Sequence, residues 1–155
     1  MKLTAFTDYS LRVLMYLAAN SGRKSTIAEI ATAFGISEHH LVKVVHFLGR
    51  QGWIATIRGK GGGMTLAMQP GDIRLGQVVR DTEGSAVPAE CFEAGGGHCI
   101  VSGCCGLQDV LAQAVQAFHG VLDRYTLADV MANRPALVQA LEFHRSLPES
   151  TVPVT

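Results

Sequence analysis

A short capped helix, a glycine turn, a longer helix and a glycine-rich hairpin follow one another within residues 26–67, and this order constrains the fold most strongly. Thr26 and Glu29 have the spacing of a capping box, and Ser37 stands where the second helix, over 38–50, is expected to begin. A short helix, a turn and a longer helix are typical of a helix-turn-helix unit. Generic helix pairs share this pattern, so the segment that follows is the more specific signal.

That segment is interpreted as a wing. Residues 53–57 and 64–67 alternate like strands, and the turn between them, 58–63, has the sequence Arg-Gly-Lys-Gly-Gly-Gly. Glycines let the backbone lie close to a phosphate or inside a narrow minor groove, where Arg58 and Lys60 would supply positive charge. A nucleotide-binding P-loop is disfavoured, because its lysine must open a helix and here a strand follows. The sequence predicts a mainly α-helical fold with a small β-wing, a winged helix-turn-helix.

Charge is unevenly distributed along a chain whose net charge is zero. Residues 1–70 carry eight Lys and Arg against three acidic side chains, and the remaining 85 residues carry five against ten. A basic N-terminal half fits a nucleic-acid surface, although an ordinary solvated surface gives the same count. We expect the second helix to face the major groove and the wing to contact the backbone or minor groove. The predicted DNA contacts are Ser37, His39, His40, Lys43, Arg58 and Lys60.

A glycine-rich loop, residues 84–106, holds all four cysteines of the chain. Cys91, Cys99 and Cys105 have the spacing Cys-x7-Cys-x5-Cys, and Cys104 adds a fourth thiol. In a reducing compartment such cysteines are more often metal ligands or redox sensors than disulfides. Three thiolates from one loop, with a further ligand from elsewhere, suit an iron-sulfur cluster better than a structural zinc tetrad.

The segment after the loop predicts a long helix from Leu107 to Tyr125, with apolar residues at helical spacing. A helix of this length in a 155-residue chain has more apolar surface than its own domain covers. This favours pairing between two subunits, with packing onto its own winged helix as the alternative. Two short helices follow, from Thr126 and from Pro135. The predicted organisation is a DNA-binding domain over 1–83, a cluster-binding loop over 84–106, a dimerisation helix with C-terminal helices over 107–145, and a flexible tail over 146–155.

Two classes of protein are not expected. The N-terminal apolar segment is interrupted by Asp8 and Arg12 and lacks the form of a signal peptide, so we expect a cytoplasmic protein with no membrane span. No nucleophile, base and orienting acid stand together at motif spacing, so we do not expect an enzyme.

Several motifs resemble those of NsrR-type repressors, the winged-helix iron-sulfur proteins that respond to nitric oxide, and the resemblance covers about the first 143 positions. The motifs are Leu-Thr-x-Phe-Thr-Asp-Tyr-Ser-Leu-Arg (3–12), Ile-Ser-Glu-His-His-Leu-Val-Lys-Val-Val-His (36–46), the wing (58–63), Glu-Cys-Phe (90–92), Cys-Gly-Leu (105–107) and Leu-Asp-Arg-Tyr-Thr-Leu-Ala-Asp (122–129).

The resemblance implies a homodimer that binds an operator in double-stranded DNA and represses nitrosative-stress genes. It also implies one iron-sulfur cluster per subunit, with 4Fe-4S favoured over 2Fe-2S. The implied ligands are Cys91, Cys99 and Cys105 of one subunit and Asp8 of the other, with Arg12 next to the cluster. A carboxylate is a harder and more easily displaced ligand than a thiolate, so one iron would stay open to nitric oxide.

Alternatives stay open within this resemblance. Iron-responsive repressors share the cysteine spacing but lack the aspartate, so Asp8 decides between nitric oxide and iron status as the signal. IscR-type relatives use a histidine where this chain has Gln108. Cys104 is outside the family pattern and is interpreted as a bystander, with replacement of Cys105 or a disulfide after cluster loss as alternatives. Arg12 could pair with Asp8, with the cluster or with a DNA phosphate.

Two other functions would use only part of these features. A thiol-disulfide or zinc-stabilised regulator would keep the same DNA-binding half. A small iron-sulfur electron carrier would explain the loop but neither the basic wing nor the capped helix pair. On its own, Asp8 near the start of a helix could serve only to complement the helix dipole.

Overall fold

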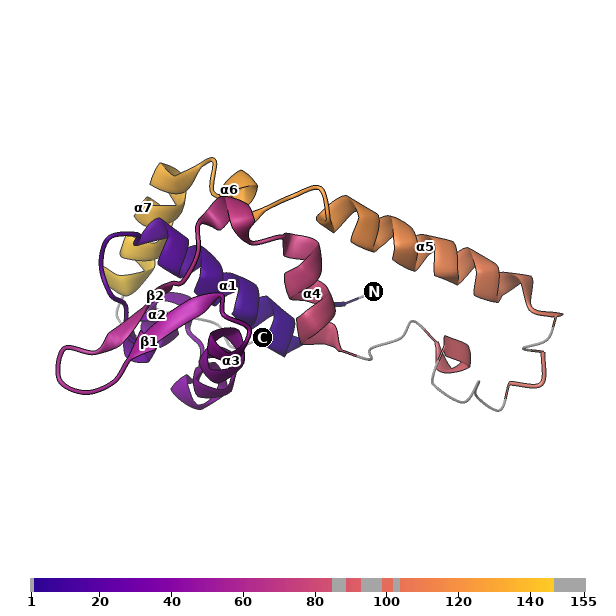
Figure 1. The fold of residues 1–155 in the computed structure, drawn as a ribbon, viewed down its shortest axis with the longest axis horizontal. Coiled ribbons are helices and arrows are strands. Elements are labelled where there is room, and N and C mark those ends of the chain that lie inside the picture. The colour runs from indigo at the N-terminus through magenta and orange to yellow at the C-terminus, as the bar shows by residue number, and fades with distance from the viewer. Residues whose placement is uncertain (1, 85–88, 93–98, 102–103, 147–155) are drawn as a thin grey trace.

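The computed structural model describes residues 2–84, 89–92, 99–101 and 104–146. Figure 1 shows a winged helix-turn-helix body from which one long helix projects, so the predicted fold class is confirmed. The elements are α1 (Ala5–Ala19), α2 (Ile27–Phe34), α3 (Glu38–Arg50), β1 (Ile54–Ile57), β2 (Gly63–Leu66), η1 (Pro70–Asp72), α4 (Leu75–Glu83), η2 (Glu90–Phe92), α5 (Gly106–Leu122), α6 (Leu127–Val130) and α7 (Arg134–Ser146).

The helix-turn-helix forms where local signals placed it. The backbone N–H of Thr26 donates to Glu29 Oε2 at 2.7 Å, and the backbone N–H of Glu29 donates to Thr26 Oγ1 at 3.2 Å, so the predicted capping box starts α2. Gly35 ends α2 with a φ of 63°, a left-handed conformation that favours glycine. Ser37 stands at the N-cap of α3 as predicted, but its side chain makes no capping hydrogen bond. The hydroxyl of Ser37 is therefore left for other contacts.

The wing is an antiparallel pair in which Ile54 lies opposite Leu66 and Ile57 opposite Gly63. β1 begins one residue later than predicted, at Ile54, and ends at the predicted Ile57, whereas β2 is shifted by one residue toward the N-terminus, to Gly63–Leu66. The turn itself needs glycine, since a Cβ on residue 62 would collide with the backbone oxygen of Ile57.

A second connection holds the wing against the body. Ser25 and Met64 form a β-bridge, with backbone N–O distances of 3.0 and 2.8 Å. The segment that leads into α2 is thus fastened to the start of β2. This bridge fixes the direction of the wing relative to α2 and α3.

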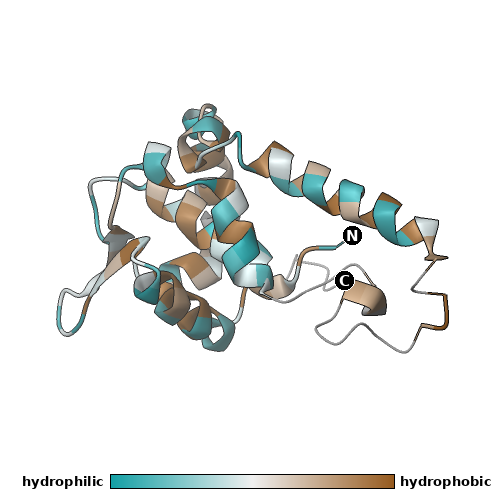
Figure 2. Cartoon of the chain, turned by 45° about the vertical axis from the view of Figure 1, so that its right-hand side comes forward, coloured by the Kyte–Doolittle hydropathy of each residue, from teal (hydrophilic) through white to brown (hydrophobic). Residues whose placement is uncertain are grey.

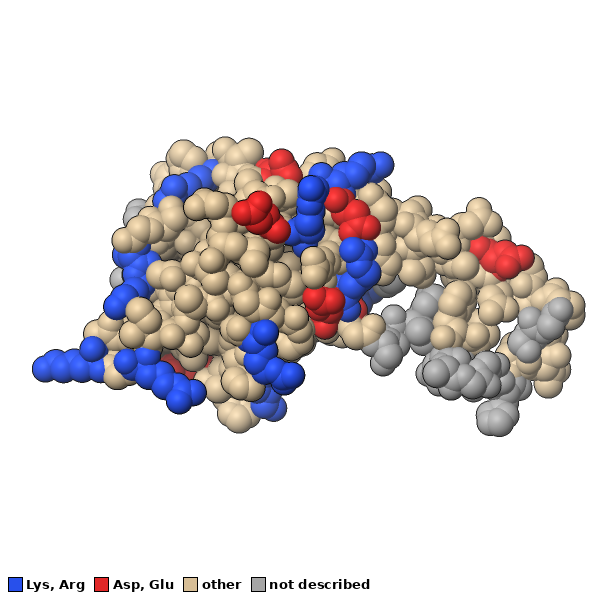
Figure 3. Space-filling model, viewed as in Figure 1, with Lys and Arg blue, Asp and Glu red and all other residues tan. Residues whose placement is uncertain are grey.

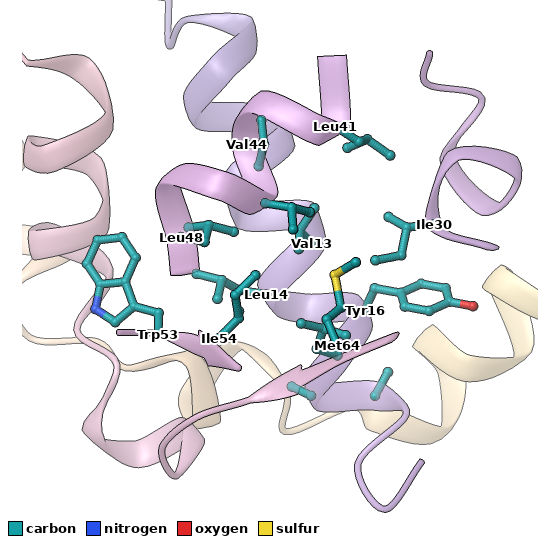
Figure 4. Close-up of a cluster of buried hydrophobic side chains, with 14 of the residues drawn as sticks. Val13, Leu14, Tyr16, Ile30, Leu41, Val44, Leu48, Trp53, Ile54 and Met64 are labelled. Atoms are coloured by element: carbon teal, nitrogen blue, oxygen red, sulfur yellow. The ribbon is translucent and has the colours of Figure 1, made fainter. Parts of the chain in front are cut away.

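The hydrophobic core is built around α1, which packs against α3, α4 and β2 (Figure 4). Val13 and Leu14 of α1 are completely buried, and so are Leu41 and Leu48 of α3. Burial of this kind makes a leucine-to-alanine change cost about 2–5 kcal/mol. Helix α1 therefore fixes the position of α3.

The C-terminal helices close back onto this body. The backbone N–H of Leu127 donates to Ile73 O at 2.8 Å, which anchors α6. The guanidinium of Arg134 donates twice to Ala19 O, at 3.0 and 2.8 Å, so α7 covers the C-terminal end of α1. Ile73 is itself buried in an extended segment, and α4 begins two residues later, at Leu75.

Helix α5 differs from the other α-helices, because none of its residues is buried and none belongs to the hydrophobic core of the described chain. Figures 1 and 2 show it extending away from the body with apolar residues along its length. It covers 106–122, so the predicted helix was three residues too long at its C-terminal end. Its junction with the body is held by two ion-pair hydrogen bonds of 3.0 and 2.7 Å between the guanidinium of Arg80 in α4 and the carboxylate of Asp123.

The predicted tail, 146–155, falls outside the described residues except for Ser146, the last residue of α7. Across the described residues, no helix has both the length and the apolar character needed to cross a membrane.

Candidate functional site

The outer face of α3 carries a row of exposed polar side chains opposite the buried Leu41 and Leu48. Their spacing of four, three and four residues places them on one side of the helix. They are His39, Lys43, His46 and Arg50. The first two belong to the predicted DNA contacts, whereas the last two were missed. The same helical spacing, continued by two turns, would have found them.

His40, another predicted DNA contact, lies on a different side of α3. Its ring stacks on Tyr9 of α1, with centroids 6.2 Å apart and an interplanar angle of 28°. Phe47, seven residues later on α3, packs edge-on against Phe6 of α1 with centroids 5.3 Å apart. His40 is therefore exposed to solvent on one side and contacts α1 on the other.

A groove runs between α3 and the wing, and its walls combine apolar and basic side chains. The lining residues are Thr26, Ile27, Val42, Val45, His46, Gly49, Arg50, Ile54, Ala55, Thr56, Ile57, Arg58, Gly59, Gly62, Gly63 and Met64. Of the predicted contacts, only Arg58 lines this groove.

Basic side chains project around the groove. Figure 3 shows Lys and Arg gathered at the wing and along the edge formed by α3. Lys24, just before α2, donates from Nζ to Gly61 O at 3.3 Å and so brings a further cation to the wing. Lys60 and Arg58 are exposed on the wing itself. A helix face and a basic hairpin set side by side match the major groove and adjacent backbone of double-stranded DNA.

The cysteine loop is described only in part. Cys91 is half-buried in η2, Cys99 is exposed, and Cys105 is the half-buried N-cap residue of α5. Cys104 is exposed, and its backbone N–H donates to Val101 O at 3.0 Å. All four thiols are free.

These thiols fit an iron-sulfur cluster by chemistry. Three soft thiolate donors lie on one loop, and one of them, Cys105, opens a helix, where backbone N–H groups favour negative charge. Within the described residues, no three Cys, His, Asp or Glu side chains are close enough to hold a metal ion. The donors are thus suitable, but one described chain does not preassemble them.

Asp8, the predicted carboxylate ligand, forms an ion pair with Arg12 at 2.9 Å, with both side chains about two-fifths exposed. The Arg12 guanidinium also lies over the ring of Phe34, the last residue of α2, at 5.7 Å from its centroid. At the start of α1, the backbone N–H of Thr4 donates to Glu83 at 2.8 Å. Because Glu83 ends α4, helix α1 begins at the base of the cysteine loop.

Electrostatic interactions also fix both ends of the segment between α5 and α6. Hydrogen bonds from the Arg80 guanidinium hold the pKa of the Asp123 carboxyl below its ordinary value. A backbone hydrogen bond from Thr126 likewise lowers the pKa of Asp129, which completes a second capping box at the start of α6. Both carboxylates are charged near neutral pH.

A winged helix with a basic outer face on α3, the second helix of the helix-turn-helix unit, defines a DNA-binding transcriptional regulator. The model of the Rrf2 family, described as iron-dependent transcriptional regulator, matches residues 3–133. The chain belongs to the Rrf2 family.

Three relatives illustrate this membership. The HTH-type transcriptional regulator NsrR of Bacillus subtilis (strain 168) is 48% identical over 143 residues, which cover 92% of this chain and 98% of that protein. The solved structure of T. potens IscR superposes with a TM-score of 0.68 at 27% identity, covering 86% of this chain and 88% of the other. CymR, the global cysteine regulator of B. subtilis, gives a TM-score of 0.68 at 27% identity, with 86% and 98% covered.

The predicted family resemblance is therefore confirmed. The relatives are named as transcriptional regulators, which agrees with the expectation that this chain is a regulator and not an enzyme. The same names set aside the alternative of a small electron carrier.

Proposed function

We propose that this protein is a homodimeric repressor whose affinity for its operator is controlled by a nitric-oxide-sensitive iron-sulfur cluster, and that it regulates nitrosative-stress genes in the cytoplasm. The proposal rests on the similarity to NsrR and on the place of α1 in the structure. Helix α1 carries Asp8, begins at the base of the cysteine loop, and packs through Phe6 and Tyr9 on α3. One rigid helix thus joins the candidate sensor to the candidate DNA contacts.

Helix α5 is the proposed dimer contact. Five exposed apolar residues along it alternate at spacings of three and four, the pattern of a helix pair. They are Leu107, Val110, Ala114, Ala117 and Val121, called here the α5 seam. Leu107 is 62% exposed and Val110 is 59% exposed, an unfavourable state for side chains of this size. The alanines between the larger residues allow two helices to approach closely.

In the proposed dimer, Cys91, Cys99 and Cys105 of one subunit and Asp8 of the other would hold a 4Fe-4S cluster, with Arg12 beside Asp8. When bound, the cluster would supply iron that reacts with nitric oxide and that is held least firmly by its carboxylate ligand. The Asp8 carboxylate then has two alternative partners, Arg12 in its own helix and a ligand position in the other subunit.

A change of partner at Asp8 acts on α1. Phe6 and Tyr9 flank Asp8 and contact α3, and packed side chains transmit a displacement because they do not deform continuously. Both copies of α3 can enter successive major grooves only if they are about 34 Å apart. A displacement of α3 through α1 would therefore lower the affinity for the operator.

The contacts proposed for the operator are His39, Lys43, His46 and Arg50 on the outer face of α3, Ser37 and His40 at its start, and Arg58 and Lys60 on the wing. Lys43 and Arg50 supply charge to the backbone, which gives affinity but no sequence information. Arg58 would enter a narrow minor groove, where its charge is attracted by the enhanced negative potential.

The deciding experiment follows cluster and DNA binding in one sample. Protein purified without oxygen is titrated with nitric oxide while visible absorbance and operator binding, by fluorescence anisotropy, are recorded together. We expect absorbance and affinity to fall in parallel. Bleaching of the absorbance at constant operator affinity would contradict control by the cluster.

A second candidate is a repressor that senses iron or cluster status, and the family description as iron-dependent favours it. An iron chelator replaces nitric oxide in the same assay. Loss of affinity with the chelator, together with no change under nitric oxide, would support this candidate over the first.

A further inference from the structure

Two branched apolar side chains are exposed on opposite walls of the groove between α3 and the wing. Val42 on α3 is 52% exposed, and Ile57 at the end of β1 is 54% exposed. The other exposed side chains of this part of α3 are polar or charged. A surface that contacts only phosphates gains nothing from an exposed valine, because phosphates are bound by charged and polar groups.

The charges that line the groove favour an anionic occupant. Arg50 and Arg58 both line it, together with His46, and its described lining includes no Asp or Glu. A helix face and a hairpin form its two walls, as expected where a DNA strand passes between the major and the minor groove. Double-stranded DNA therefore fits this groove better than an apolar peptide does.

Val42 lies where it can reach base edges. It is three residues after His39 and four before His46, so it shares a side of α3 with two residues of the proposed DNA-facing row. A valine has no donor or acceptor and cannot recognise the polar edge of a guanine or an adenine. Only thymine presents an apolar group, its C5-methyl, in the major groove.

We propose that Val42 contacts the C5-methyl group of a thymine and thereby sets a preference for thymine at one position in each operator half-site. This inference rests on the proposed DNA-binding function and adds to it a residue that determines sequence specificity. Burial of one methyl group changes affinity by about fourfold. Loss of both methyls in a symmetric site would change it by about fifteenfold.

Replacement of thymine by deoxyuridine tests this, because it removes the methyl group and leaves base pairing intact. An operator is first selected from random duplex DNA with anaerobically purified wild-type protein. Each thymine is then replaced singly, and the dissociation constants of wild type and Val42→Ala are measured. We expect one position per half-site where deoxyuridine weakens wild type about fourfold and has no effect on Val42→Ala.

Matched variants separate the contact with the thymine methyl from the loss of apolar atoms elsewhere and from a uniform loss of DNA affinity. Val130→Ala removes the same atoms from a residue that is 43% exposed on α6, away from the groove, and should keep the wild-type deoxyuridine profile. Ile57→Ala should weaken binding to every duplex equally and also keep the profile. Val42→Thr preserves the shape of the side chain but replaces one of its two methyl groups with a hydroxyl, and it should reduce the methyl effect to a value between those of wild type and Val42→Ala.

Two results would overturn the inference. Specific binding with a flat deoxyuridine profile for wild type, or the same profile for wild type and Val42→Ala, would remove the methyl contact and leave the proposed function standing. Wild-type protein that prefers no sequence at all would overturn the proposed function, and this inference with it.

Discussion

The ring of Tyr9 in α1 stacks on the ring of His40 in α3. Tyr9 directly follows Asp8, the residue that is proposed to bind the cluster. Aromatic pairs of this kind contribute about 0.5–1.5 kcal/mol beyond area burial. We expect a double-mutant cycle of Tyr9→Ala and His40→Ala, measured by urea unfolding, to give a coupling near the lower end of this range, because His40 is exposed. Each variant should also narrow the difference in operator affinity before and after nitric oxide. Additive effects would show that the two rings act independently.

Asp8 and the cysteines should have separable effects on the cluster. Asp8→Ala removes one carboxylate, so we expect the cluster to assemble while its response to nitric oxide or its operator affinity falls. Cys99→Ala should abolish assembly, since thiolates are the principal ligands. Cys104→Ala is the matched control and should keep wild-type iron and sulfide content. A Cys104 variant without iron, beside a loaded Cys105 variant, would reverse the ligand assignment.

The basic residues on α3 and those on the wing should contribute to DNA affinity in two different ways. Lys43→Ala and Arg50→Ala should weaken binding to all duplexes and lower the slope of log affinity against log salt by about one unit each, as for a lost phosphate contact. Arg58→Ala should cost about 1–3 kcal/mol if it enters a groove. Arg124→Ala, between α5 and α6, is the control. Unchanged affinity after removal of both Arg58 and Lys60 would contradict the wing contact.

Measurement of the oligomeric state tests whether the α5 seam forms the dimer interface. Charge placed in the middle of a helix pair is not tolerated when the pair is buried. Val110→Asp combined with Ala114→Asp should give a folded monomer, measured by light scattering after size exclusion. Val130→Asp makes the same change on α6 and should leave the wild-type state. A dimer that persists in the double variant would place the interface outside the seam.

The Arg80–Asp123 ion pair should give a pH-dependent difference in stability. The pKa of Asp123 is lowered in the folded protein, so the stabilisation is present above the ordinary carboxyl pKa of about 3.9 and is lost as pH falls through the lower folded value. Asp123→Asn should therefore be less stable than wild type near pH 7, with a difference that shrinks below about pH 4. Urea unfolding across this range measures it, with Asp109→Asn as the control on α5. If the difference in stability between wild type and Asp123→Asn did not change with pH, the charge of Asp123 would not be its cause.

Features that depend on near neighbours in the chain could be predicted from the amino-acid sequence. The capping box of Thr26 and Glu29, the glycine turn at Gly35 and the glycine-rich wing are local, because each is formed by hydrogen bonds or backbone conformations within a few residues. The order of these elements was therefore predicted correctly, whereas the ends of β1, β2 and α5 differ from the prediction by one to three residues.

Tertiary packing, in contrast, set which distant residues those elements contact. It turned His40 toward Tyr9, set Val42 in a groove with the wing, and brought Arg134 to Ala19 across 115 positions of the sequence. Helical periodicity gives an exposed side but not its partner, because the partner depends on how distant segments pack. For α5 the sequence predicted more apolar surface than its own domain covers, with packing onto its own winged helix as the alternative, and tertiary packing leaves the seam exposed in one subunit.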